Sequence, residues 1–400
     1  MTRTDETFIN ILQYALHGGE YTEKFSVEEW KAIFSLADSQ LLLPIIFESV
    51  RKNESLIAEK ALFEYLKKRT IAAVVRQTAK SVDFERLYAK FREKNLHPLV
   101  VKGRLCSRLY PMPDHRVSAD DDIFVSDDEL AECRSVLVEA GLAGEIPENE
   151  VADEMTYKNE FLYVELHRSL FDSSEGAPED FNRFFVDIHK KRREIGGIFS
   201  LPAHEHMLYL ILHSFKHFLY CGVGIRQTCD IAFWGREYAA EIDWELLLSQ
   251  LSSVRADKFA AAQFRIATTR LGFEFDLPRV WQKMVDEADE LPMLDDMFEG
   301  GVYGADSLSR LHSSTAVLTA VRAERTGENP GIVKSLFPNF EYMSGKYRYV
   351  KAYPILLPVG WAHRLISYAA ELRTKNSSAS ESLSVAKKRK ALMKVYGIIK

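Results

Sequence analysis

The sequence has few of the features that mark secreted or membrane-spanning proteins. Its four cysteines are scattered and none forms a C-x-x-C pair, which argues against a disulfide framework or a cysteine-based zinc site. The N-terminal residues are polar and include acids, unlike a secretory signal. No apolar run approaches the ~18 residues that a membrane-spanning helix needs. We therefore expect a cytoplasmic protein with no membrane span.

The sequence also lacks an excess of positive charge, internal repeats and the best-known nucleotide-binding loops. Its formal net charge is −6 at pH 7, which weakly disfavours a protein that coats nucleic acid by charge alone. Neither a Walker loop nor a dinucleotide-binding glycine motif is present. The 400 residues, of which 46% are apolar, suffice for two or three packed units.

The hydrophobic periodicity changes twice along the chain. It is helical from Glu6 to about Asn95, and it shortens to strand-like runs between Pro98 and Leu170. It becomes helical again from about His204 onward. We predict an α+β fold in which a small mixed sheet lies between helical regions. The expected divisions are an N-terminal helical region (1–95), an α/β core (96–200), a helical lobe lining the cleft (201–325) and a C-terminal segment with a basic tail (326–400).

The feature with the clearest chemistry is the run from Ser118 to Val125, which contains three consecutive aspartates. On a strand, Asp120 and Asp122 share one face and lie about 6–7 Å apart, whereas Asp121 points to the other face. A third acid, Glu165, lies in another strand-like run. Three acids on adjacent strands can hold the divalent cations used in phosphoryl and nucleotidyl transfer. Taken alone, the aspartate triplet favours an acidic surface turn; its combination with Glu165 and the preceding Lys-Gly turn favours the metal site instead.

These residues belong to a longer pattern with a recognisable likeness. A Lys-Gly turn at Lys102, a Tyr-Pro loop at Tyr110, an arginine at Arg116 and the Asp-x-Asp strand follow one another in that order. The block from His97 to Val125 resembles a family of uncharacterised bacterial nucleotidyltransferases in the polymerase-beta superfamily. Later segments are similar to the same family, namely Glu165-Leu-His167, His213–His217, 222–230 and 353–364.

The resemblance implies an enzyme that moves a nucleoside monophosphate from a nucleoside triphosphate such as ATP to an acceptor hydroxyl and releases pyrophosphate. It implies Mg²⁺ (or Mn²⁺), with Asp120, Asp122 and Glu165 as the catalytic residues and metal ligands. Lys102 and Gly103 would lie in the turn that meets the triphosphate, and Arg116 would contact phosphate or pair with the acids. Further nucleotide contacts would come from Lys216 and Arg226. The acceptor stays open among a small molecule, a tRNA and a protein, as does the oligomeric state.

Two departures from the superfamily pattern bear on activity. The usual turn is Gly-Ser, whose hydroxyl helps to bind triphosphate, but Lys102-Gly103-Arg104 has no hydroxyl. The middle residue of Asp-x-Asp is usually apolar, and here it is Asp121. A buried carboxylate is costly unless it is paired, so we expect Asp121 to be exposed or to pair with Arg104 or Arg108.

Several polar residues have both a functional and a structural interpretation. His213 and His217 are one helical turn apart and are expected to line the cleft or to be hydrogen-bonded within a helix; no third zinc ligand is evident. Arg226 and Asp230 form either an intrahelical ion pair or a phosphate contact with its orienting acid. His167 would tune Glu165, touch substrate or end a strand. The charged face of the region 58–94, the polar run from Asn376 and the basic cluster Lys387–Lys390 are interpreted as a solvated face, a linker and a solvated helix face.

Two other kinds of function remain compatible with the sequence. The altered turn and Asp121 would also fit a non-catalytic relative that serves as a binding or scaffold protein. A kinase could use the same acids, but it would release a nucleoside diphosphate rather than pyrophosphate.

Overall fold

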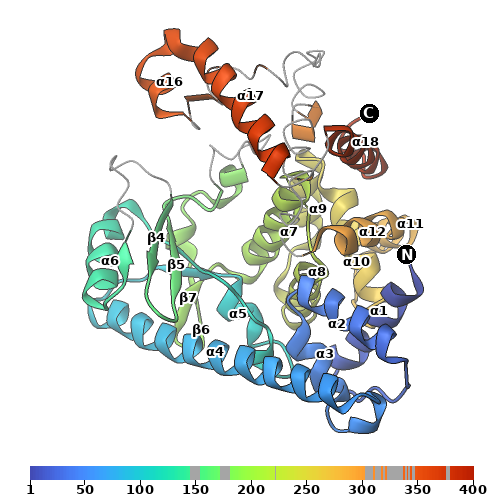
Figure 1. The fold of residues 1–400 in the computed structure, drawn as a ribbon. Helices are drawn as coiled ribbons and strands as arrows, with labels where there is room; N and C mark the ends of the chain where they lie inside the picture. Colours follow the sequence, from blue (N-terminus) through green and yellow to red (C-terminus); the bar gives the residue numbers. More distant parts are fainter. Residues whose placement is uncertain are drawn as a thin grey trace.

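The computed structural model describes residues 1–144, 154–171, 181–220, 222–301, 347–374 and 379–400, together with isolated positions between 302 and 346. Figure 1 shows a small sheet that is flanked by helices. The predicted α+β class is confirmed, because a five-stranded mixed sheet and a two-stranded sheet lie among helical regions.

The N-terminal region is helical, as its periodicity predicts. It contains α1 (Arg3–Leu16), α2 (Val27–Ser39), α3 (Leu43–Val50), a short 3₁₀ turn η1 (Glu54–Leu56) and α4 (Lys60–Glu93). Ser26 caps α2, since its hydroxyl accepts a hydrogen bond from the backbone of Glu29 while the Glu29 carboxylate accepts one from the backbone of Ser26. Helix α4 is 34 residues long and runs along the base of the molecule from the N-terminal helices to α6.

The main sheet has the strand order β1-β2-β5-β4-β3. Its strands are short: β1 (Leu99–Val101), β2 (Asp121–Phe124), β3 (Ala143–Gly144), β4 (Glu154–Lys158) and β5 (Tyr163–His167). The central pair β2 and β5 is parallel, and the other pairs are antiparallel. Ile123, Val164 and Leu166 are fully buried, so the middle of the sheet is anchored in the core. This anchoring fixes the directions of the polar side chains that alternate with them.

Shorter elements connect the strands. Helix α5 (Gly103–Ser107) follows β1, η2 (Pro113–His115) precedes β2, and α6 (Asp127–Glu139) follows β2. The turns η3 (Phe181–Phe185) and η4 (Ile188–Lys191) lead to the hairpin of β6 (Arg193–Ile195) and β7 (Ile198–Ser200), which the sequence patterns did not predict. The Ser200 hydroxyl donates a 2.8 Å hydrogen bond to the carbonyl of Val100, so this hairpin supports the outer edge of β1.

The helical lobe packs beside the sheet. Its helices are α7 (Ala203–Tyr220), α8 (Ile225–Glu237), η5 (Ala239–Glu241), α9 (Trp244–Ser253), α10 (Asp257–Thr269), α11 (Arg279–Glu287) and α12 (Leu291–Gly300). Helix α7 is buried over most of its circumference, and His213, Lys216 and His217 are among its partly buried polar residues.

The C-terminal part differs from expectation in two places. Helix α18 (Ala379–Val395) begins inside the polar run whose composition suggests a linker, so that interpretation is wrong from residue 379 onward. The basic cluster on α18 is not uniformly solvated either. Arg389 is buried and donates hydrogen bonds to the carbonyls of Phe218 and Tyr220, which ties α18 to the end of α7. The positive charge of the cluster did not predict that Arg389 donates hydrogen bonds to carbonyls at the C-terminal end of α7.

Before α18, the chain forms α16 (Arg348–Ala352), η6 (Pro354–Leu356) and α17 (Leu357–Thr374), which stand out from the body in Figure 1. Among the described residues, no helix combines the length and apolar character that crossing a membrane requires.

Candidate active site

The parallel pairing of β2 with β5 brings two acids together. In this register Asp122 lies opposite Glu165, and His167 follows Glu165 on the same face of β5. One ligand atom from each of Asp122, Glu165 and His167 lies within 4.8 Å of the others. Two carboxylates and an imidazole at this separation could share one divalent cation.

Asp122 is buried and sits between two cationic groups. Its Oδ1 atom lies 2.9 Å from Nζ of Lys102 and 3.3 Å from Nε2 of His167. Burial would raise the pKa of Asp122, but the charges of Lys102 and His167 outweigh it and hold that pKa well below its ordinary value. Asp122 therefore stays ionised at neutral pH, as a metal ligand requires.

The same contacts raise the pKa values of the two cationic groups, His167 and Lys102. Burial would lower the pKa of His167, but its contacts with Asp122 and Glu165 raise it to about 9. Burial would likewise lower the pKa of Lys102, and Asp122 is the main reason that it is raised instead. The cluster is thus charge-compensated by side chains of this chain.

Lys102 occupies an unusual backbone conformation. Its φ is 47° and its ψ is −123°, which is costly for a residue with a Cβ atom. The backbone N–H of Lys102 donates a 3.1 Å hydrogen bond to Nε2 of His206 on α7. Lys102 follows β1, whose Val101 is the register partner of Asp122, so this bend brings its ammonium group to Asp122.

Gly103 follows this bend and lies against the start of β2. A Cβ atom placed on Gly103 would be 3.8 Å from the carbonyl oxygen of Asp120 and 3.8 Å from Oδ1 of Asp121, which is ordinary contact. The protein atoms around Gly103 therefore do not by themselves require glycine there.

Helix α7 supplies the other wall around Lys102. Nε2 of His213 lies 3.3 Å from Nζ of Lys102, and Nε2 of His217 lies 3.0 Å from Nε2 of His213. Burial lowers the pKa of His217 to about 3 and that of His213 well below its ordinary value, with the charges of Lys102 and Lys216 acting in the same direction. Both rings are therefore neutral, and each nitrogen can serve one hydrogen bond at a time. Neither histidine is part of the three-residue ligand cluster.

The structure corrects our expectation for Asp121. This carboxylate is buried, and its partner is Lys80 of α4, whose Nζ lies 3.2 Å from Oδ2 of Asp121. Neither predicted arginine is its partner. Arg104 pairs with Glu85, while Arg108 donates to the carbonyls of Ile195 and Gly196. Burial raises the pKa of Asp121 to about 6 despite the opposing effect of Lys80.

Lys80 also holds the backbone that leads into β2. Its Nζ donates to the carbonyls of Ser118 at 3.2 Å and Asp120 at 3.0 Å, and to the Ser118 hydroxyl at 3.1 Å. Gln77, one turn earlier, accepts a 3.0 Å hydrogen bond from the backbone of Ser118. One face of α4 therefore fixes the segment from which Asp120 and Asp122 project.

Asp120 lies immediately before β2 rather than within it, and it is half-buried. The ligand cluster contains Asp122, Glu165 and His167 but not Asp120. Its negative charge nevertheless contributes to the raised pKa of Lys102 and of Tyr209. Asp120 is therefore close to the same group of side chains.

Arg116 and Asp230 form a buried ion pair of their own. Nε and Nη2 of Arg116 donate to the two carboxylate oxygens of Asp230 at 3.0 and 2.5 Å, and the Tyr110 hydroxyl donates to Asp230 at 2.8 Å. Arg226, one turn before Asp230 on α8, donates instead to the carbonyl of Val117. These contacts bind the loop before β2 to α8, so the intrahelical interpretation of Arg226 and Asp230 does not describe them.

The sequence patterns did not predict that three further residues lie at this site. Lys80 falls on what the charges of α4 suggest is a solvated face, although it lies four residues before Phe84 and seven before Leu87 on the apolar side of the helix. That position could have indicated burial. His206 and Tyr209 fit the pattern of an apolar helix, and no sequence signal connects them to Lys102.

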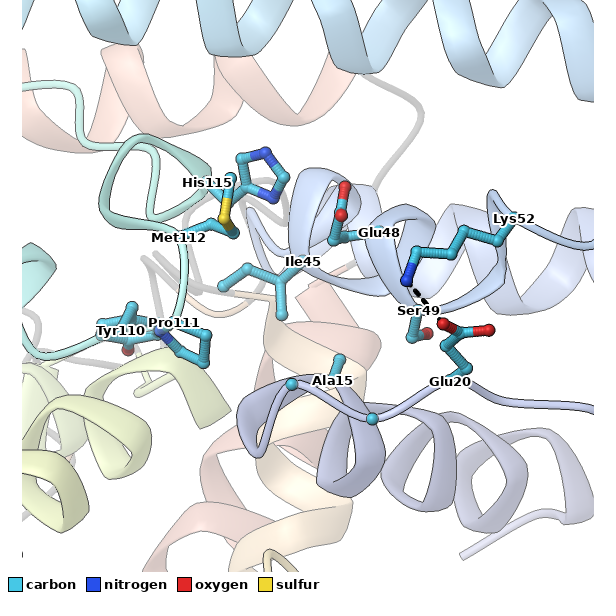
Figure 2. Close-up of a pocket in the computed structure, with 12 residues that line it drawn as sticks. Ala15, Glu20, Ile45, Glu48, Ser49, Lys52, Tyr110, Pro111, Met112 and His115 are labelled. Carbon is cyan, nitrogen blue, oxygen red and sulfur yellow. Dashed lines mark hydrogen bonds and ion pairs between the residues drawn. The ribbon is translucent and has the colours of Figure 1, made fainter.

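The molecule also contains a separate pocket of about 150 Å³, shown in Figure 2. It is lined by the end of α1, by α3 and by the loop from Tyr110 to His115. Lys52 and Glu20 form an ion pair at one side of it. None of the acids or histidines of the ligand cluster lines this pocket.

A comparison with known protein families identifies the class of protein to which the chain belongs. The family model described as uncharacterised nucleotidyltransferase matches residues 26–272, which is more than half of the chain. The chain therefore belongs to this nucleotidyltransferase family. No curated protein and no solved structure matches it. The matched span contains β1 to β7, includes the candidate acids Asp120, Asp122 and Glu165, and extends through α7 and α8.

Because burial lowers the pKa values of His206 and His217, we expect the unfolding free energy of the protein to depend on pH. Burial lowers the pKa of His206 to about 3 in the folded chain, whereas an unfolded histidine titrates near 6.5. The unfolded state thus binds more protons between these values, so stability falls as the pH drops below about 6.5.

In His206→Gln, an amide oxygen can replace Nε2 as acceptor without titrating. The loss of unfolding free energy between pH 7.5 and 5.5 should then shrink by about 1 kcal/mol. His217→Gln should have a similar effect, because that imidazole is also buried and neutral. Urea unfolding at the two pH values measures both. An unchanged difference in each variant would contradict neutral burial of these rings.

Proposed function

We propose that this chain transfers a nucleoside monophosphate from a nucleoside triphosphate to an acceptor hydroxyl, with release of pyrophosphate and dependence on Mg²⁺ or Mn²⁺. The observation that carries the proposal is the register of β2 and β5, which places Asp122 opposite Glu165 with His167 beside them. Family membership supports nucleotidyl transfer in general.

The donor set fits a divalent cation. Asp122 is held ionised, Glu165 is partly exposed, and His167 offers a nitrogen within the same 4.8 Å group. Asp122, Glu165 and His167 would hold the cation, with Asp120 as a further acid close by. A bound cation would neutralise phosphate charge and lower the pKa of the attacking hydroxyl. It would also have to replace the positive charges that now face Asp122.

The protein's own groups have distinct roles in this proposal. Lys102 presents an ammonium group beside Asp122 and would move to the triphosphate as charge accumulates there. Gly103 leaves the adjacent backbone open to a phosphate. Glu165 is the best placed acid to accept the proton of the acceptor hydroxyl, because its side chain retains access to solvent.

The remaining predicted residues would act around this centre. We assign Arg116 and Asp230 a positioning role, since each satisfies the other away from solvent. Arg226 steadies the same loop through Val117. Lys216, His213 and His217 would shape the electrostatic surroundings of Lys102 and a bound nucleotide.

One observation favours a second candidate function. Lys102 and His167 already neutralise Asp122, as they would in a non-catalytic relative that uses this fold for binding. The two functions differ in whether a nucleotide and a metal ion bind together.

The test is a thermal-shift and calorimetric screen of the four nucleoside triphosphates, each with and without Mg²⁺. We expect stabilisation by at least one of them only when Mg²⁺ is present. Glu165→Gln should abolish it, whereas Glu160→Gln, which makes the same change at an exposed position between β4 and β5, should retain it. No stabilisation by any triphosphate would favour the binding protein. Release of a nucleoside diphosphate in the presence of acceptors would indicate a kinase.

A further inference from the structure

Within the segment around α16, η6 and α17, several side chains contact one another. The Phe337 and Trp361 rings meet edge to face at 5.4 Å, and the Tyr349 hydroxyl lies 3.1 Å from Nδ1 of His363. A Cβ atom on Gly360 would come within 2.8 Å of the Val350 side chain, so the two helices approach closely there. The Tyr349–His363 contact and the close approach at Gly360 hold α17 against α16.

The outward side is apolar. Ile355, Val359 and Ile366 are 87%, 54% and 68% exposed, and Ala362 between them is also exposed. Val359, Ala362 and Ile366 are three and four residues apart, which places them along one stripe of α17, and Ile355 lies in η6 just before this helix. Tyr353, immediately before η6, is 64% exposed. Burying such side chains is favourable, so a continuous stripe in water indicates a contact surface.

The same segment is basic in an otherwise acidic chain. Residues 346–375 contain six lysines and arginines and one glutamate, whereas the whole chain has a net charge of −6. Lys351 is exposed, two residues before Tyr353. Exposed aliphatic residues, an aromatic residue and basic residues together are typical of segments that lie in the interface of an anionic membrane.

We propose that η6 and α17 form a peripheral docking surface for an anionic lipid bilayer. Ile355, Val359 and Ile366 would enter the boundary between headgroups and acyl chains, and Tyr353 would lie at headgroup level. Lys351, which is exposed beside this surface, would contact the anionic headgroups. The aliphatic stripe favours a bilayer over a nucleic acid as the partner. Contacts with phosphates and bases would leave the almost fully exposed Ile355 without an apolar environment. The segment docks on the surface without spanning it.

Co-sedimentation of the full chain with vesicles tests this proposal. Phosphatidylcholine vesicles containing phosphatidylglycerol are compared with vesicles of phosphatidylcholine alone. We expect the protein to bind the anionic vesicles, and we expect this binding to weaken as salt is raised. The double variant Ile355→Ser/Val359→Ser should bind roughly tenfold or more weakly, and Lys351→Gln about fivefold more weakly.

The matched control is Val138→Ser/Val280→Ser, which removes two valines of similar exposure (59% and 61%) from α6 and α11. It should bind like the wild type, and unchanged thermal melting should show that all variants fold. Equal binding to both kinds of vesicle, or equal loss in the control, would overturn the proposal. So would self-association or RNA binding that Ile355→Ser/Val359→Ser abolishes in a protein that ignores vesicles.

Discussion

An Asp122→Asn variant is expected to lose about a thousandfold in the proposed nucleotidyl transfer. The neutral amide removes the only ligand of the cluster that is buried and held fully ionised. A metal ion contributes several kcal/mol to stabilising transition-state charge, and about 4 kcal/mol corresponds to this factor. The measurement is metal-dependent release of pyrophosphate, together with calorimetric titration of the triphosphate in Mg²⁺.

The control for this variant follows from the contacts of Asp122. A neutral amide in place of this carboxylate would leave Lys102 with a weakened partner, so lost activity could reflect disturbed packing. Asp122→Asn/Lys102→Met removes both charges and should regain stability without regaining activity. Full activity in a folded Asp122→Asn protein would contradict the assignment of Asp122 as a metal ligand.

A Lys80→Met variant is expected to lose about 3–5 kcal/mol of unfolding free energy. Lys80 and Asp121 are both buried, and removal of one partner leaves an uncompensated charge in the interior. The variant also loses the three hydrogen bonds that Lys80 donates to the segment before β2. Chemical denaturation at neutral pH measures the loss.

A double-mutant cycle separates these two contributions. In Lys80→Met/Asp121→Asn no unpaired charge remains, so a substantial part of the stability should return. The backbone of Ser118 and Asp120 would still lack its donor, so metal-dependent nucleotide binding should stay weakened even where stability recovers. Lys31→Met, which removes an exposed lysine, is the matched control and should change stability little. An equally small loss in Lys80→Met would show that the Lys80–Asp121 pair is unimportant for the fold.

The sequence revealed most about the site where residues are local. The run of three aspartates, the strand-like run around Glu165 and the Lys-Gly turn each lie within a few positions, and strand alternation separates Asp121 from its neighbours. The strand-like run from Ser118 to Val125 contains β2, although Asp120 lies just before that strand. Strand alternation also shows why His167 shares a face with Glu165, although the family resemblance does not assign it as a metal ligand.

Pairings between distant segments could not be derived in the same way. Lys80 meets Asp121 across 41 positions, and Arg116 meets Asp230 across 114. Arg104 and Arg108 were natural partners for Asp121 because they are near it in sequence, yet α5 turns them toward other groups. The choice among partners depends on how α4 and α8 pack against the loop before β2, and periodicity does not specify that packing.

The sequence by itself determined the α+β class and the succession of helical, strand-like and helical regions, because periodicity encodes those properties directly. Its local residue types also indicated Asp120, Asp122 and Glu165 as candidate acids. Only the tertiary structure decided that β2 and β5 are parallel neighbours, which brings Asp122 and Glu165 together. It also decided that Lys102 and His167 neutralise Asp122 and that Lys80 is buried. These outcomes depend on burial and on distances between segments far apart in the chain, which determine whether a charge is solvated or paired.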